Sequence, residues 1–158
     1  MWRVARWLIA LGEIGGGVFM LSLVLHPPST GSGEYSGGWT LFFAEGLGVA
    51  ATVAGVNLLR NTPSGYPMSF AVQAIQILRI YGGRFIFAVI IGPQILINFI
   101  AAPGSIPMGG PLGFAATLYA AVAHSGAMNT WARGIGINVL ALVASGALLV
   151  RLADDAGW

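Results

Sequence analysis

Long apolar runs that carry almost no charge constrain this chain more than any other feature of its sequence. Hydrophobic residues make up 56% of its 158 positions and charged residues only 8%, whereas a typical soluble domain carries about 25% charged residues. So few charges cannot cover a surface that faces water. The composition therefore excludes a water-soluble globule and predicts an integral membrane protein.

Five apolar segments are long enough to cross a bilayer as helices. At about 1.5 Å per residue, about 20 helical residues cross a hydrocarbon core of roughly 30 Å. One more segment, residues 67–80, is too short to span and carries polar residues at helical spacing, which indicates an interfacial or partly inserted helix. We expect a single all-α transmembrane bundle over residues 1–158, with spans at residues 4–25, 39–59, 84–102, 112–128 and 134–152.

Two of these segments have features that refine the prediction. The first could be mistaken for a signal peptide, but it contains Glu13 and ends at His26-Pro27-Pro28, which is no small-x-small cleavage site. We expect it to be retained as a spanning helix. In the third segment, Pro93 is expected to kink the helix.

The basic residues orient the predicted bundle. All seven are arginines, and with five spans and a cytoplasmic N-terminus only Arg151 lies outside. If residues 112–128 do not span, Arg133 moves outside in its place, so the arginines fit four spans as well as five. We expect five spans, because an apolar stretch is hard to leave in water. We also expect a multi-pass location in a prokaryotic plasma membrane.

Composition also limits partners and cofactors. The net charge of +2 is too small and too scattered for a nucleic-acid surface. Without cysteine the chain has no disulfide and no thiolate metal site, and it contains no histidine-glutamate metal motif. The partners predicted are the lipid bilayer and other membrane subunits or further copies of this chain.

Glycine predicts how the helices contact one another. The chain contains 24 glycines, and small residues recur every four positions in Gly12-x-x-x-Gly16 and in Ala44-x-x-x-Gly48-x-x-x-Thr52. In a membrane, such spacing lets helix backbones approach closely. We interpret these patterns as packing contacts between helices.

Two acidic residues, Glu13 and Glu45, are embedded in apolar segments and are the first candidates for a functional site. An ionised and unpaired carboxylate in hydrocarbon costs several kcal/mol, so we expect each acid to be protonated or paired. Antiparallel first and second helices would place the two acids at depths that differ by under about two turns. They would form a proton, cation or small-ligand site, or else hydrogen-bond across a glycine contact.

Other polar residues give weaker indications. The amides Gln94, Asn98 and Asn138 could line a polar interior, but such side chains more often join helices by hydrogen bonds. Arg79 and Arg84 flank Gly82-Gly83. They are typical interfacial anchors, and the alternative is that they bind an anionic headgroup or act as a gate.

His124 is the remaining candidate ligand. A structural role is expected, while single-histidine ligation of haem or a pigment, or a hydrogen bond to a quinone, stays open. No cofactor and no metal are predicted.

The functional prediction rests on the lack of a catalytic set and on loops too short for a soluble activity. We expect a non-catalytic subunit of a larger or homo-oligomeric membrane assembly. One alternative is a proton, cation or small-solute channel or transporter that uses Glu13 and Glu45. The other is a membrane enzyme acting on a lipophilic substrate, with a glutamate as general acid or base.

Overall fold

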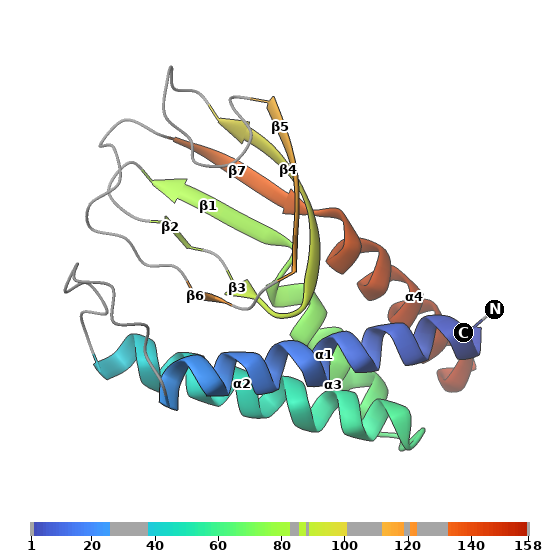
Figure 1. The fold of residues 1–158 in the computed structure, drawn as a ribbon. Coiled ribbons are helices and arrows are strands. Elements are labelled where there is room, and N and C mark those ends of the chain that lie inside the picture. The colour runs from blue at the N-terminus through green and yellow to red at the C-terminus, as the bar shows by residue number, and fades with distance from the viewer. Residues whose placement is uncertain are drawn as a thin grey trace.

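The computed structural model describes residues 2–25, 38–82, 86–87, 89–100, 112–118, 121–122 and 133–157. These residues form helices and strands, arranged as Figure 1 shows. The helices are α1 (Trp2–Leu25), α2 (Gly38–Leu59), α3 (Gly65–Ile75) and α4 (Val139–Ala156). The strands are β1 (Leu78–Gly82), β2 (Ile86–Phe87), β3 (Val89–Ile90), β4 (Pro93–Ile100), β5 (Leu112–Leu118), β6 (Ala121–Val122) and β7 (Arg133–Asn138).

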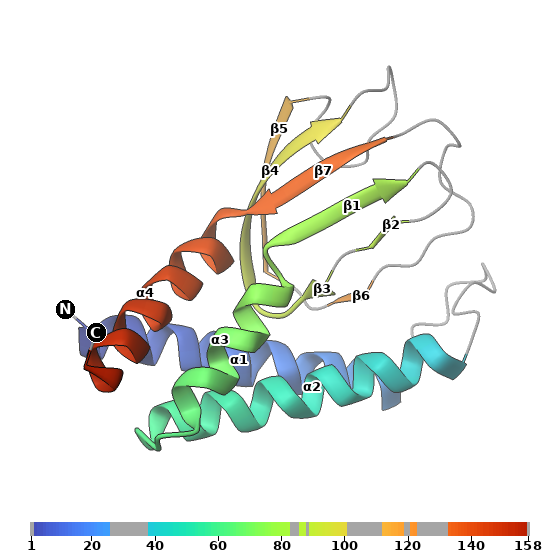
Figure 2. The same ribbon diagram turned by 180° about the vertical axis from the view of Figure 1, so that it is seen from behind.

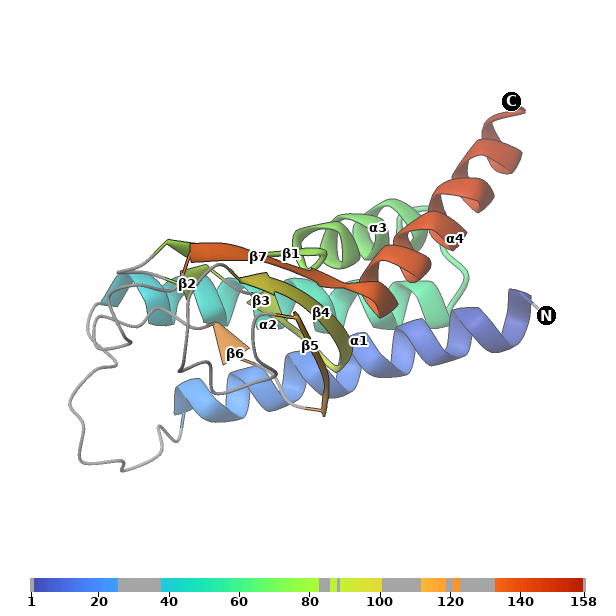
Figure 3. The same cartoon turned by 90° about the horizontal axis from the view of Figure 1, so that it is seen from above.

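The longest helices, α1 and α2, lie side by side and run in opposite directions (Figures 1 and 3). Small residues line their contact. A Cβ atom added to Gly17 of α1 would lie 2.6 Å from the carbonyl oxygen of Gly48 in α2, and one added to Gly55 would lie 2.6 Å from the carbonyl oxygen of Ala10. Because these distances are far below normal contact, the helices can approach this closely only where side chains are absent.

Another part of α1, around Gly12 and Gly16, packs against a turn and not against a helix. A Cβ atom on Gly16 would lie 2.2 Å from the backbone nitrogen of Gly92, which precedes β4. Gly92 itself has φ +81°, and a Cβ there would lie 2.7 Å from the carbonyl oxygen of Gly12. This turn therefore needs glycine both for its backbone conformation and for its contact with α1.

The five-stranded sheet has the order β2-β1-β7-β4-β5, and every neighbouring pair is antiparallel. Ile80 lies opposite Ile135, and Ile97 lies opposite Ile137, so each pair shares a face of the sheet. A smaller sheet pairs β3 with β6. Figure 2 shows that α3 leads into β1 and that β7 leads into α4.

Asn138 ties these two junctions together. Its backbone N–H donates to the carbonyl oxygen of Ile77 at 2.8 Å, between α3 and β1. Its side-chain oxygen accepts from the N–H of Ala141 at 3.4 Å, which places it as the N-cap of α4. A buried asparagine at a helix start satisfies a backbone donor that the helix cannot.

The described core consists of two apolar clusters. One joins α1, α2 and α3 to the β3–β4 region, and its buried members are Met20, Ala51, Ala54, Val72, Val89 and Ile91. The other lies where α1, α2, α3 and α4 meet, and its buried members are Ala10, Leu58, Tyr66 and Leu148. The helices are therefore packed against one another through both clusters, and the first cluster also includes β3 and the residue that follows it.

The predicted five-span bundle is wrong. The third and fourth predicted spans, residues 84–102 and 112–128, contain β2 to β6 in place of helices, and the fifth, residues 134–152, begins with β7. The expected helix over residues 67–80 ends at Ile75, and β1 follows. Among the described residues, one helical segment, Trp2–Ser22, is long and apolar enough to cross a membrane.

The physical reason is that apolar runs do not distinguish a buried strand from a helix. The third segment is rich in isoleucine, valine and phenylalanine, which favour strands. Pro93, expected to kink a helix, is the first residue of β4, where a strand tolerates proline. In β7, Gly134 and Gly136 alternate with isoleucines, which is a strand period.

Candidate functional site

Glu13 is the centre of a buried polar cluster between α1 and α3. Its side chain has no exposed surface. The Ser69 hydroxyl donates a hydrogen bond to Glu13 Oε2 at 2.7 Å, and Gln73 Nε2 donates to Oε1 at 3.0 Å. Each carboxyl oxygen thus has a neutral donor from α3.

These donors belong to a polar stripe that α3 turns inward. Ser69, Gln73 and Gln76 recur at helical spacing and are all buried. Gln76 Nε2 donates to the carbonyl oxygen of Val72 at 2.9 Å, and Gln76 Oε1 accepts from the N–H of Ile91 at 2.9 Å. The stripe, expected at a bilayer interface, instead joins α3 to α1 and to the chain before β4.

Gln94 extends the polar interior at the start of β4. It is only 2% exposed, and its Nε2 donates to the carbonyl oxygen of Val89 at 3.4 Å. Its amide therefore closes the tight connection between β3 and β4.

Glu45 does not join this site. It is exposed on α2, whereas the α2 residue beside the Glu13 Cβ is Gly55. Glu45 is thus ten residues away along α2, or about 15 Å. The expectation that the two acids differ by under about two turns is wrong, and the structure brings together Glu13 and α3.

The remaining candidates are dispersed. Asn98 and Arg79 lie in β4 and β1, where both pair with Gly136 of β7. Asn138 caps α4. Arg84 and His124 lie outside the described residues. The sequence candidates therefore do not form one cluster.

The arrangement around Glu13 suits two tasks. In the part of the chain that the structure describes, the one ion pair is Arg151–Asp155, so Glu13 is held by neutral donors and not by a cation. Such a carboxyl can hold a proton, and it fixes α1 against α3 through two hydrogen bonds. Within the same residues, no three metal-ligating acidic, histidine or cysteine side chains gather.

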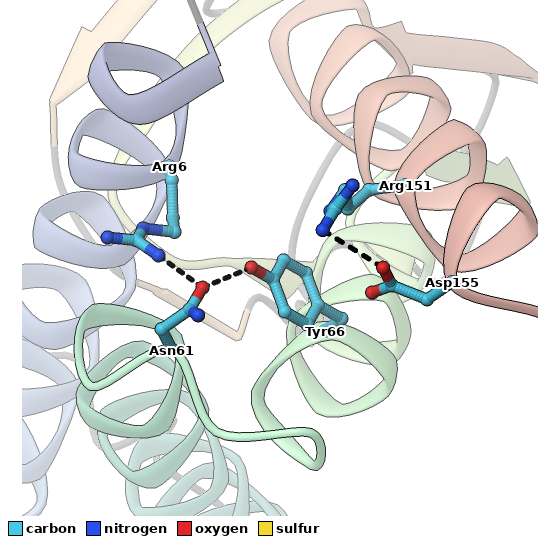
Figure 4. A network of polar contacts seen from close by, with 5 residues as sticks. All are labelled: Arg6, Asn61, Tyr66, Arg151 and Asp155. Carbon is cyan, nitrogen blue, oxygen red and sulfur yellow. Dashed lines mark hydrogen bonds and ion pairs between the residues drawn. The ribbon is translucent and has the colours of Figure 1, made fainter.

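A second polar network lies at the end of the molecule where α1 begins and α4 ends, and the sequence analysis missed it. Figure 4 shows Arg6 and Tyr66 both donating to Asn61 Oδ1, and Arg151 pairing with Asp155 on α4. Arg6 and Arg151, which the five-span topology placed on opposite sides of the membrane, thus lie at the same end of the molecule. The one signal in the sequence was the Asn-Thr-Pro turn that follows Arg60.

The backbone conformation of Asn61 suits its role as the shared acceptor. Its φ of +57° lies in the left-handed region, which asparagine tolerates at a helix C-terminus. This conformation ends α2 and leaves the amide oxygen free to accept from α1 and α3.

Comparison of the chain with protein-family models, with curated proteins and with solved structures gives no match.

Proposed function

We propose that this chain is a non-catalytic subunit of a membrane assembly. The observation that carries the proposal is the number of large apolar side chains exposed on the helices. Only 28% of the most apolar stretch of α1 is buried, whereas the core helix of a soluble protein is mostly buried. The exposed side chains are Val4, Trp7, Leu8, Leu11, Val18, Phe19 and Leu25 of α1, Phe42, Phe43, Val49 and Val53 of α2, and Leu140, Leu142, Val143, Leu149 and Val150 of α4.

Lipid suits the helical part of this surface. A helix satisfies its backbone hydrogen bonds internally, so apolar side chains on it can face hydrocarbon without an unpaired polar group. At 24 residues, α1 is about 36 Å long, which exceeds a hydrocarbon core of roughly 30 Å. These features favour α1 as the element that anchors the chain in the bilayer.

A protein partner suits the sheet better than lipid does. One face of the sheet exposes Leu78, Ile80, Ile97 and Ile135. The seven-residue strand β5 has β4 as its one neighbour among the described strands. A free strand edge needs hydrogen bonds that hydrocarbon cannot supply. The sheet therefore favours another subunit, or a second copy, as its cover.

The test combines extraction with native mass. We expect the 16.4 kDa chain to stay in the membrane pellet after a carbonate wash and to run in mild detergent as an assembly heavier than one copy. Release by carbonate would contradict the membrane location. A lone monomer would contradict the subunit role.

Matched variants separate the two kinds of surface. Ile135 of the sheet and Leu142 of α4 are equally exposed, at 49% each. We expect Ile135→Asn to dissociate the assembly and Leu142→Asn to leave its mass unchanged. The opposite pattern, or no effect of either variant on the mass, would show that the sheet face is not the subunit contact.

A second candidate function is proton uptake at Glu13, favoured by its complete burial among neutral donors. Glu13→Gln would remove the protonatable group, and Glu45→Gln at the exposed position is the matched control. In proteoliposomes we expect Glu13→Gln to reduce proton flux and Glu45→Gln to leave it unchanged. Equal flux in the native chain and Glu13→Gln would remove this candidate without affecting the subunit proposal.

A further inference from the structure

Two arginines from distant parts of the chain flank one tyrosine at the end of the molecule where α1 begins and α4 ends. Arg6 comes from α1 and Arg151 from α4, and they lie on opposite sides of Tyr66 (Figure 4). Trp2 stacks on the same tyrosine with ring centroids 6.1 Å apart. Three helices thus bring cationic and aromatic side chains to one place.

Each of the three side chains around Tyr66 has a buried donor without an acceptor. Trp2 Nε1, Arg6 Nε and Arg151 Nε are inaccessible to solvent and have no hydrogen-bond partner among the described residues. Leaving a buried N–H unsatisfied is unfavourable, and native structures rarely contain several together. Three such donors around one tyrosine show that this end of the molecule is short of hydrogen-bond acceptors, which an oxygen-rich ligand would supply.

The charge of the site indicates that the ligand is an anion. The acceptor that Arg6 contacts is the neutral amide oxygen of Asn61, so its positive charge is not neutralised there. Arg151 pairs with Asp155 at 2.9 Å, but the two side chains are 41% and 46% exposed and remain open to a competing anion. The two arginines and one aspartate leave one positive charge.

We infer that Trp2, Arg6 and Arg151 bind a phosphate group. A guanidinium presents a planar fork of donors that matches phosphate oxygens, and the indole N–H of Trp2 is a further donor that lacks an acceptor among the described residues. The group could belong to an anionic phospholipid or to free phosphate. The lipid source rests on the membrane location proposed above, whereas the phosphate chemistry rests on these side chains alone.

The first test removes one charge at a time from the full chain in uncharged detergent. Binding of phosphatidylglycerol in mixed micelles with phosphatidylcholine is measured for Arg6→Gln, Arg151→Gln and the control Arg3→Gln. Arg3 is exposed near the start of α1, so its loss should weaken binding only by the about fivefold that surface attraction gives. We expect Arg6→Gln and Arg151→Gln to weaken it about tenfold or more. Equal weakening by all three variants would overturn the site.

The second test looks for a gain of affinity, which a misfolded variant cannot produce. Asp155→Asn frees the Arg151 guanidinium, whereas Asp154→Asn removes the same charge from an exposed neighbour. We expect Asp155→Asn to strengthen binding more than Asp154→Asn does. Equal effects of the two variants, or weaker binding by Asp155→Asn, would overturn the role of Arg151.

Inorganic phosphate distinguishes the source of the group. If it binds with the same dependence on Arg6 and Arg151 as the lipid does, the site takes free phosphate. If it fails to bind while phosphatidylglycerol binds, the site takes a lipid headgroup. Binding of neither would overturn the inference. A chain that carbonate releases, but that still binds phosphate through both arginines, would contradict the membrane proposal and leave this site intact.

Discussion

Neighbouring glycines in α1 are predicted to respond in opposite ways to the same substitution. A Cβ atom on Gly15 would have no atom within 4 Å, but one on Gly16 would lie 2.2 Å from the Gly92 nitrogen and 2.7 Å from the carbonyl carbon of Ile91. Non-bonded carbon atoms normally lie about 3.5–4.0 Å apart. Gly16→Ala therefore requires the Ile91–Gly92 backbone to move by about 1 Å or more.

The magnitudes follow from two opposing effects. Alanine is favoured over glycine inside a helix by about 1 kcal/mol, so Gly15→Ala should stabilise the protein by about that amount. Overpacking against well-packed neighbours costs about 1–3 kcal/mol. Because all three atoms that the new Cβ would approach within 3 Å belong to backbone, we take the upper value. The net destabilisation is then about 2 kcal/mol.

Thermal unfolding in one detergent, followed by circular dichroism, measures the difference. For a chain of this length, 1 kcal/mol shifts Tm by about 2–4 °C. We expect Gly15→Ala to raise Tm by about 2–4 °C and Gly16→Ala to lower it by about 4–8 °C. Shifts of the same sign and size would refute the reasoning, because Gly16 would then not face the turn before β4.

Three further predictions use the same assay. Ser69→Ala removes a donor to the buried Glu13 carboxyl and should destabilise the protein by about 1–3 kcal/mol; an unchanged Tm would mean that this hydrogen bond is not formed. Leu148 is fully buried and its neighbour Leu149 is 54% exposed, so Leu148→Ala should cost about 2–5 kcal/mol and Leu149→Ala about 0.5 kcal/mol or less, and similar losses would contradict the packing of α4. Asn138→Ala removes the N-cap of α4 and should cost about 0.5–2 kcal/mol, whereas a stabilised variant would argue against the cap.

The first two helices were predictable from sequence, and the sheet was not. Residues 4–25 and 39–59 were expected to be helical and lie in α1 (Trp2–Leu25) and α2 (Gly38–Leu59), because long apolar runs with small residues leave few alternatives. In the third predicted span, hydropathy gave the same signal although the segment forms strands. The turn at Gly92 and Pro93 is visible in the sequence as a break in the apolar run. The structure of this turn, however, depends on the contact of Gly92 with α1.

The candidate site was half predictable. Glu13 stands out in the sequence as an acid within an apolar helix, and the structure buries it. Ser69 and Gln73 are spaced so that they share a helix face, but the sequence does not show which neighbour that face meets. The local spacing predicts which residues share a face of α3. Only the tertiary contact with α1 determines that this face is buried.

The contact between α1 and the turn before β4 also sets an order of assembly. During synthesis α1 and α2 emerge first, and contacts between elements close in the chain form fastest. The surface around Gly12 and Gly16, however, meets Gly92, which is synthesised 76 to 80 positions later. In a nascent hairpin of α1 and α2, a strip of α1 backbone around Gly12 and Gly16 therefore stays uncovered until that turn has been synthesised. A chain truncated before Gly92 would keep this strip uncovered.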